Sequence, residues 1–341
     1  MTSCLEASAN LHLEPILDHL KDYELFGIFD ERFGKPYMGS SAFGVMGFID
    51  VLSKIPMARK AIKEIAKMSL GMDHVLLVDS PAFNIPLAKQ IRKINPHVKI
   101  TYYILPQVWA WKAKRVKVVE ALCDNLASIL PFEKDFYTKS IYVGHPLLDE
   151  IKIRKESLTY DNLVAFLPGS RKSEIKKLLP IFKEVAKNLP CKPLLVIPPF
   201  FSDDQISDIY ADISEFEISH SIQEALAKSD FAYVCSGTAT LEASLIGTPF
   251  VLVYKAKWLD YQIAKRFVKL DHIGIANIIF DFAGEKELHP EFLQEDVNVQ
   301  NLLDAYENMD RFEFLNKSKK LRKLLKHGSS ENVAKLIAPT K

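Results

Sequence analysis

The chain has 341 residues, with 44 Lys and Arg against 43 Asp and Glu and a formal net charge of +1. That length predicts about two domains, at about 100–200 residues each. The apolar share of 48% and the charged share of 26% exclude a disordered chain. The balanced charge argues against a strongly basic nucleic-acid binder, so we expect no nucleic acid among the partners.

Alternating strands and helices are predicted along the first half. Short apolar runs predict strands at 74–78, 98–105 and 126–130. Helical spacing of apolar residues predicts helices at 83–95 and 108–123, and a short helix at 131–139. This order is typical of a parallel sheet with helices on both faces.

The same order restarts after a polar stretch at 149–162, which we interpret as a linker. Strands are predicted at 163–167, 193–197, 230–235 and 250–254. Helices are predicted at 174–187, 240–246, 257–269 and 301–306, and a Lys-rich amphipathic pattern covers 310–341. The predicted fold is α/β, with two Rossmann-like domains at 1–150 and 151–310. A helical tail at 311–341 follows, with the option of packing back on the N-terminal domain.

Cysteine and histidine patterns give no support to a metal site. The four Cys residues form no CxxC pair, and the nine His residues form no HExxH motif. We therefore expect no metal and no disulfide framework, which fits a reducing compartment. The first residues lack a signal-peptide pattern, and no apolar run of about 18 residues predicts a membrane span. We expect a cytoplasmic protein for which contact with a membrane surface stays open.

A first candidate phosphate site is Leu167-Pro-Gly-Ser-Arg171, which directly follows a predicted strand. Gly169 allows close backbone approach, Ser170 can cap the next helix, and Arg171 offers a planar fork to phosphate oxygens. A plain strand-to-helix turn with a capping Ser explains the same residues about equally well.

A second candidate follows another strand, in Cys235-Ser-Gly-Thr-Ala-Thr-Leu-Glu242. Ser236, Gly237 and Thr238 supply small side chains and backbone N–H groups at a helix start, and Glu242 can accept hydrogen bonds from a ribose diol. A hydroxyl-rich helix cap is the alternative. The two turns together indicate a nucleotide diphosphate, and the missing GxGxxG and Walker patterns disfavour NAD and ATP.

Asp79 ends a first-half strand, in Val78-Asp-Ser-Pro-Ala-Phe-Asn84. Catalytic residues of α/β folds gather at such strand ends, although a carboxylate that only caps the following helix has the same pattern.

Two segments suit a lipid or phosphorylated ligand. In the first, Trp109 and Trp111 precede the basic residues Lys112 and Arg115, and the alternative is core Trp residues beside a solvated helix face. The second is the nearly continuous apolar segment 42–52, whose alternative is a buried helix. Its candidate lipid-facing side chains are Val45, Met46 and Phe48.

In chain order these motifs resemble one family, lipid-A-disaccharide synthase, an inverting glycosyltransferase of the two-domain GT-B type. The resemblance covers nearly the whole chain. It is carried by residues 78–84, 107–115, 130–134 and 144–146, by the two phosphate-type turns, and by Asn277.

The resemblance implies that UDP-2,3-diacylglucosamine donates its sugar to 2,3-diacylglucosamine 1-phosphate, called lipid X. The products are lipid A disaccharide 1-phosphate and UDP, formed with inversion and without a metal or other cofactor. This step belongs to the synthesis of lipopolysaccharide in Gram-negative bacteria. Basic clusters at 112–117 and 255–269 suit an anionic membrane surface, with the protein peripheral to the inner face of the inner membrane. A homodimer is a further option.

The resemblance also implies site residues. Asp79 matches the family's important acid and is our candidate general base, with Glu6 as a second catalytic candidate. The residues implied for the nucleotide are Gly169, Ser170, Arg171, Ser236, Gly237, Thr238, Thr240, Glu242 and Asn277.

The chain departs from the family pattern near its start. The family's Gly-Glu-x-Ser-Gly-Asp loop reads Leu5-Glu-Ala-Ser-Ala-Asn10, so Asn10 cannot act as an acid. Ala82 replaces a second acid of the family, which leaves Asp79 as the carboxylate of its turn. The family begins with an apolar strand before this loop, whereas Met1 of this chain falls almost on the loop. Most of that strand is therefore missing, and we suspect a start upstream.

Two other functions stay open. A nucleotide-sugar epimerase of the same two-domain plan would also hold UDP, but it has no need of a lipid-facing segment. The second is a non-catalytic peripheral membrane protein that binds lipid, but this function does not explain the phosphate-type turns or Asp79.

Overall fold

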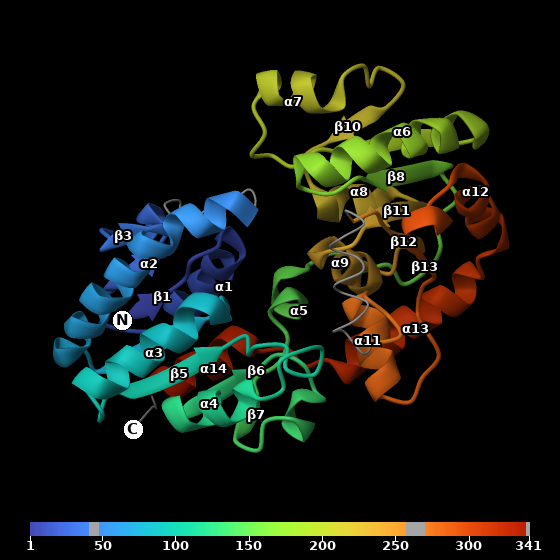
Figure 1. Cartoon of the computed structure of the whole chain (residues 1–341). Coiled ribbons are helices and arrows are strands. Elements are labelled where there is room, and N and C mark those ends of the chain that lie inside the picture. The colour runs from blue at the N-terminus through green and yellow to red at the C-terminus, as the bar shows by residue number, and fades with distance from the viewer. Residues whose placement is uncertain (41–47, 257–269, 339–341) are drawn as a thin grey trace. The chain divides into compact units, whose positions relative to one another are not determined.

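A computed structural model shows two compact units, each an α/β domain (Figure 1). Unit 1 comprises Met1–Asp149 and Leu325–Lys341, and unit 2 comprises Glu150–Leu324. The structure describes residues 1–40, 48–256 and 270–338, except for the side chains of 48–54. Within these residues, no helix combines the length and the apolar character needed to cross a bilayer.

Unit 1 is built on a seven-stranded parallel sheet with the order β3-β2-β1-β4-β5-β6-β7. Its strands are β1 (Thr2–Ser3), β2 (Gly27–Phe29), β3 (Met38–Gly39), β4 (His74–Val78), β5 (Lys99–Tyr103), β6 (Asn125–Ser128) and β7 (Ser140–Tyr142). The helices are α1 (Ala7–Asp18), α2 (Phe48–Met68), α3 (Pro81–Ile94), α4 (Arg115–Leu122), α5 (Pro146–Glu150) and α14 (Ser329–Ile337).

Alternate strand residues of this sheet enter two different cores. Val75 and Leu77 of β4 pack in one core with α2, α3 and α4. Leu76 and Val78 pack in the other with α1 and α14. The central strands are therefore apolar at successive positions, as expected for a sheet covered on both faces.

Unit 2 has a six-stranded parallel sheet with the order β10-β9-β8-β11-β12-β13. Its strands are β8 (Leu163–Leu167), β9 (Lys192–Val196), β10 (Glu217–Ser219), β11 (Phe231–Cys235), β12 (Phe250–Tyr254) and β13 (Glu291–Leu293). The helices are α6 (Lys172–Asn188), α7 (Asp203–Tyr210), α8 (Ile222–Lys228), α9 (Thr238–Ile246), α11 (Ile275–Phe282), α12 (Val299–Asn308) and α13 (Arg311–Leu324).

The predicted α/β fold with two parallel sheets is confirmed, and three strands, at 74–78, 163–167 and 250–254, have the predicted bounds. The helix predicted at 108–123 is wrong in its first half. Turns occupy 108–114, where Lys112 has a positive φ of 53°, and the helix begins at Arg115. The helix predicted at 131–139 shrinks to a 3₁₀ turn at Glu133–Asp135. The helix predicted at 257–269 lies outside the described residues.

The tail divides between the two units. Helix α13 packs on α9 within unit 2, and α14 packs on α1 and β5 within unit 1. Asp149 accepts hydrogen bonds from the backbone N–H groups of Gly328 (2.9 Å) and Ser329 (2.8 Å), at the start of α14. The assignment of the acceptor to the N-terminal domain and of the nucleotide to the C-terminal domain stays a prediction.

The first strand is short but paired on both sides. Thr2 and Ser3 pair with β2 and with β4, and the Met1 amino group donates to the carbonyl oxygen of His74 at 2.8 Å. A two-residue β1 therefore occupies the position between the two strands.

Candidate functional site

The strand order of each sheet reverses at one point. In unit 1 this point lies between β1 and β4, and in unit 2 it lies between β8 and β11. Ligands of open α/β sheets bind beyond the carboxyl ends of the strands at such a reversal. Glu6 and Asp79 follow the two strands of the first pair, and the two phosphate-type turns follow the second pair.

The turn that carries Asp79 has a strained backbone. Asp79 and Ser80 have φ values of 48° and 44°, a left-handed conformation that costs non-glycine residues free energy. Neighbouring groups hold the turn in place. Tyr102 Oη donates to the Asp79 carbonyl oxygen at 2.7 Å, and Asn84 Nδ2 donates to the same oxygen at 2.8 Å.

The carboxyl of Asp79 is half-buried. Burial raises its pKa, while the backbone N–H of Ser80 and the charge of His12 lower it in part. A raised pKa makes a carboxylate a stronger base, provided that it is still ionised at the working pH. Asp79 therefore has the environment expected of a general base.

Glu6 stands at the N-cap position of α1 with an exposed side chain. Asn10 binds this loop through its side chain, which donates to the Glu6 carbonyl oxygen at 2.8 Å and accepts from the Asp30 N–H at 2.8 Å. The residue that replaces the family's acid is thus a buried structural residue.

Sequence reasoning missed His12, whose charge acts on Asp79 and also on the buried His145. His12 lies in α1, six positions after Glu6. His145 accepts a hydrogen bond from the Leu147 N–H at Nδ1 (3.3 Å), and burial lowers its pKa to about 3. His145 is therefore neutral at physiological pH.

In unit 2 the two phosphate-type turns line one cavity of about 270 Å³. Polar side chains and backbone come from the ends of β8 and β11, and apolar side chains come from β9 and its neighbours. The lining residues are Leu167, Gly169, Ser170, Arg171, Glu174, Val196, Pro198, Ile222, Cys235, Ser236, Gly237, Thr238, Ala239 and Glu242.

Gly169 is required by this geometry. Its φ is 106°, and a Cβ at this position would lie 2.7 Å from Glu174 Oε2 and 3.1 Å from Cys235 Sγ. A side chain would therefore meet both steric and backbone strain. The absence of a side chain brings the backbone of the first turn close to the end of β11.

Glu242 lies in the second turn of α9 and lines the cavity. Burial is the main cause that raises its pKa to about 7, and the charge of Glu150 is the second. Such a carboxyl can accept or donate a hydrogen bond near neutral pH, which suits a ribose diol.

Two nucleotide candidates lie outside this cavity. Thr240 is buried, and its hydroxyl donates to the Gly237 carbonyl oxygen at 2.8 Å. Asn277 is fully buried; its Nδ2 donates to His289 O and Glu291 Oε1, both at 2.8 Å, and its Oδ1 accepts from the Leu288 N–H at 2.7 Å. Both side chains bond within the protein here, and their contact with the nucleotide stays a prediction.

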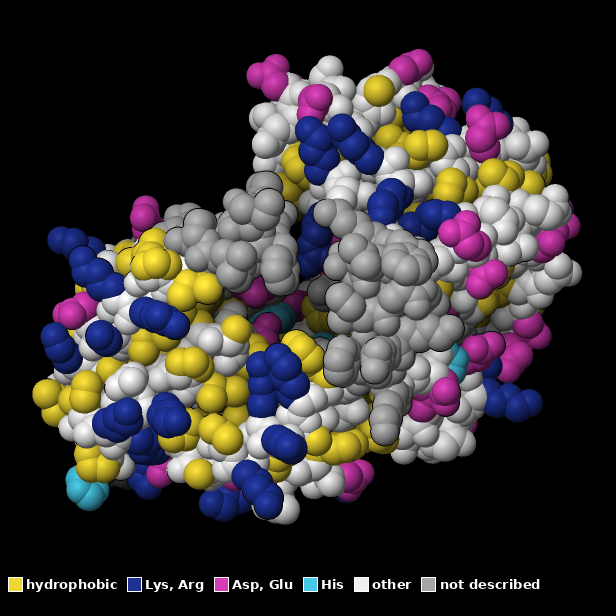
Figure 2. Space-filling model, in the orientation of Figure 1, with side chains coloured by type: hydrophobic (Ala, Val, Ile, Leu, Met, Phe, Trp, Pro, Cys, Tyr) yellow, Lys and Arg dark blue, Asp and Glu magenta, His cyan; other side chains and the backbone are white. Residues whose placement is uncertain are grey.

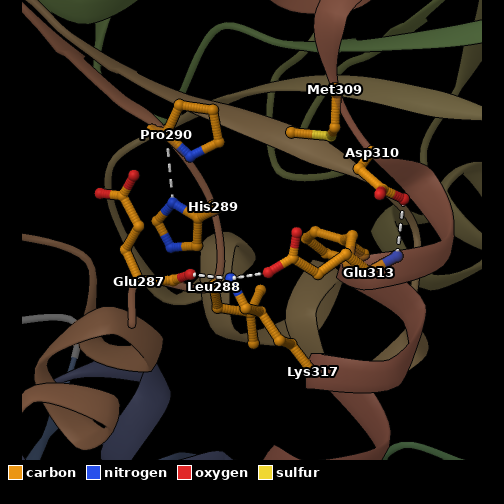
Figure 3. A pocket seen from close by; sticks show the side chains of 9 residues that line it. Glu287, Leu288, His289, Pro290, Met309, Asp310, Glu313 and Lys317 are labelled. Atoms are coloured by element: carbon orange, nitrogen blue, oxygen red, sulfur yellow. Dashed lines mark hydrogen bonds and ion pairs between the residues drawn. The ribbon is translucent and has the colours of Figure 1, made fainter. Parts of the chain in front are cut away.

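A second cavity of unit 2, of about 210 Å³, lies beside the segment that leads into β13 (Figure 3). Glu287, Asp310 and Glu313 bring carboxylates to it. The Lys317 ammonium already binds the Glu287 carbonyl oxygen (2.7 Å) and Glu313 Oε1 (2.9 Å). This excess of negative charge does not suit a diphosphate.

The candidate lipid-facing residues are placed in part. Trp109 is buried and meets Phe132 edge to face at 5.5 Å, so its assignment to a lipid-facing surface is wrong. Trp111 is 45% exposed, with Lys112 Nζ 4.0 Å and Arg115 Cζ 5.3 Å from its ring centroid. Val45 and Met46 lie outside the described residues, as does the side chain of Phe48.

Solved structures share the fold. A UDP-N-acetylglucosamine 2-epimerase from Rickettsia bellii has a TM-score of 0.58 at 12% identity, covering 99% of this chain and 95% of that one. The MurG protein of Acinetobacter baumannii has a TM-score of 0.51 at 12% identity, covering 84% and 79%. At these identities the likeness supports the GT-B type of fold alone.

Sequence comparison identifies the family. A lipid-A-disaccharide synthase of Campylobacter jejuni (strain RM1221) is 49% identical over 359 aligned residues, covering 99% of this chain and 98% of the relative. One from Helicobacter pylori (strain J99) is 47% identical over 353, covering 99% and 97%. The family model described as lipid-A-disaccharide synthetase matches residues 1–338. The chain therefore belongs to the lipid-A-disaccharide synthetase family of glycosyltransferases.

Proposed function

We propose that the chain transfers the sugar of UDP-2,3-diacylglucosamine to lipid X, giving lipid A disaccharide 1-phosphate and UDP. The observation that carries the proposal is the cavity of unit 2, where two turns suited to phosphates meet a carboxyl suited to ribose. Membership of the synthetase family supports this substrate pair. An epimerase is supported by likeness of fold alone.

The cavity is proposed to hold UDP through charge and backbone donors. Arg171 offers guanidinium N–H groups to the diphosphate, and its side chain is 75% exposed and thus accessible. Ser236 and Thr238 lie at the start of α9, where backbone N–H groups and the helix dipole favour an anion. The departing diphosphate would be stabilised by the same groups.

Asp79 is proposed to act as the general base of one in-line displacement. The acceptor hydroxyl oxygen forms a bond to the anomeric carbon, and the bond from that carbon to the diphosphate breaks. The hydroxyl proton passes to the Asp79 carboxylate, and UDP leaves with the bonding electron pair. The partly buried, raised-pKa carboxyl supports this role. Glu6, at the neighbouring strand end, is a second candidate.

Contact with an anionic membrane surface is proposed for the face around Trp111. An exposed indole beside Lys112 and Arg115 is typical of a membrane interface, where the ring is amphipathic and the cations meet lipid phosphates. Figure 2 shows Lys, Arg and hydrophobic side chains intermixed over α3 and α4 of this unit. The homodimer stays a prediction.

The proposal is tested by UDP release. Purified protein is mixed with UDP-2,3-diacylglucosamine and lipid X, with omission of lipid X as the control. We expect UDP and a tetra-acylated disaccharide phosphate by mass spectrometry, both dependent on lipid X. Binding of UDP without any disaccharide would contradict the proposal, and conversion of UDP-N-acetylglucosamine to its 2-epimer would favour the epimerase.

A further inference from the structure

One carboxylate binds both the backbone and the side chain of Arg171. Glu174 Oε1 lies 2.8 Å from Arg171 Nη1, and Glu174 Oε2 accepts from the Arg171 backbone N–H at 3.3 Å. The Arg171 side chain is 75% exposed, whereas that of Glu174 is 10% exposed. The cation is therefore accessible to a ligand, and its anionic partner is held in the protein.

This carboxylate lies inside the first phosphate-type turn. Glu174 lines the cavity of about 270 Å³ together with Gly169, Ser236 and Thr238. Its Oε2 would be 2.7 Å from a Cβ on Gly169, so the oxygen fills the space that the missing side chain leaves. A buried negative charge thus occupies the part of the turn proposed to receive a diphosphate.

Carboxylate and phosphate oxygens accept from the same donors, namely guanidinium and backbone N–H groups. We propose that Glu174 is an internal competitor of the diphosphate: its carboxylate occupies Arg171 when no nucleotide is bound, and UDP must take the guanidinium from it. This inference rests on the proposed function, because it assumes that the cavity binds UDP.

The competition weakens UDP binding for a physical reason. Glu174 is the third residue of α6, where its carboxylate also completes a capping box with the Arg171 N–H. The Glu174 carboxylate therefore stays in place when the guanidinium turns to the diphosphate, and it then remains buried without its ion pair. The same carboxylate also repels the incoming diphosphate, because both are negatively charged. Both effects lower the affinity for UDP and speed its release after transfer.

The variant Glu174→Gln separates charge from capping. Gln can make the same capping hydrogen bond but carries no charge. We expect Glu174→Gln to lower the dissociation constant of UDP about fivefold by isothermal titration calorimetry, an effect of the size of a partly exposed ion pair. Uridine, which has no phosphate, should bind wild type and variant equally. A UDP affinity that falls, as expected if Glu174 only positions Arg171, would overturn the proposal, and so would an unchanged affinity.

A matched control lies on the same helix. Glu184 forms an exposed ion pair with Lys187 at 2.8 Å, so Glu184→Gln removes a charge of α6 away from the cavity. We expect this control to bind UDP as the wild type does, and melting temperatures will show that all three proteins are folded. Failure of the wild type to bind UDP would refute the proposed function itself, whereas wild-type binding with a wrong response of Glu174→Gln refutes only the competition.

Discussion

The hydroxyl of Ser3 donates a hydrogen bond to Oδ1 of Asn84 at 2.7 Å, and both side chains are buried. Ser3 ends β1, just before the Glu6 loop, and Asn84 lies in α3, just after the Asp79 turn. The Asn84 amide also donates to the carbonyl oxygens of Val78 (3.0 Å) and Asp79 (2.8 Å). One side chain therefore connects the two strand ends that carry the candidate catalytic acids.

We predict that Asn84→Ala reduces both stability and turnover. Loss of the amide removes the partner of the Ser3 hydroxyl and leaves the Asp79 carbonyl oxygen with Tyr102 Oη, which should cost about 1–3 kcal/mol in the free energy of unfolding. Asn95→Ala is the control, since Asn95 binds the Ser69 carbonyl oxygen at 2.8 Å in another part of unit 1. Chemical denaturation and kcat are measured for both. Equal loss of turnover in the two variants would show that Asn84 has no special link to the site.

Removal of the Arg171 guanidinium should weaken nucleotide binding. We predict that Arg171→Ala raises the dissociation constant of UDP about 10- to 100-fold, because hydrogen bonds to charged groups contribute about 1.5–3 kcal/mol. Lys172→Ala is the control, since the neighbouring ammonium pairs with Asp208. Calorimetric titration with UDP measures both. An unchanged UDP affinity of Arg171→Ala would show that the diphosphate binds elsewhere.

The buried Glu133 should make stability depend on pH. Burial raises the pKa of its carboxyl from 4.5 to about 7, although the N–H groups of Ile129 and Leu130 partly offset this. The folded protein therefore keeps a proton that the unfolded chain releases, and this contribution to the free energy of unfolding is lost as pH rises from about 5 to 7.

The comparison of wild type with Glu133→Gln isolates this group. Urea denaturation at pH 5, 6 and 7 should show a wild-type decline that exceeds that of the variant by about 1–3 kcal/mol. Glu64→Gln, at an exposed ion pair with Lys67, is the control and should follow the wild type. Parallel pH curves for wild type and Glu133→Gln would mean that Glu133 is ionised throughout.

Trp111 should contribute to membrane contact but not to nucleotide binding. We predict that Trp111→Ala lowers partitioning onto phosphatidylglycerol vesicles several-fold and leaves the dissociation constant of UDP unchanged. The indole is exposed and is flanked by two cations, so its loss removes an interfacial anchor. Tyr160→Ala removes another exposed aromatic side chain, 68% exposed, and serves as the control. Unchanged vesicle binding of Trp111→Ala would exclude this face as the membrane contact.

The central strands could be predicted from sequence because both of their faces are buried. The strand at 163–167 is a continuous apolar run, and the strand at 74–78 is apolar after His74. The edge strands β3 and β7 have two and three residues, too few to show a pattern. The helix predicted from 108 failed because apolar residues there pack into the core from a turn, which their spacing does not reveal.

The candidate site could be predicted only as far as strand ends and small residues reveal it. The two phosphate-type turns share a cavity because the strands that they follow, β8 and β11, are neighbours in the sheet. The hydrogen bonds of Asn277 could not be predicted, because its partner Glu291 is 14 residues away and no motif links the two residues. The sequence predicts Glu174 only as part of a helix, since a capping carboxylate and a ligand-facing one have the same sequence pattern.

The most direct test of the proposed mechanism is the single-turnover rate of Asp79→Asn with saturating UDP-2,3-diacylglucosamine and lipid X. Asn keeps the size of the side chain but cannot take the proton of the acceptor hydroxyl. We predict a rate about 10²- to 10⁴-fold below wild type, with the dissociation constant of UDP unchanged. Asp18→Asn, at the exposed end of α1, is the control. A rate of Asp79→Asn near that of the wild type would contradict the account, because Asp79 would then only cap its helix.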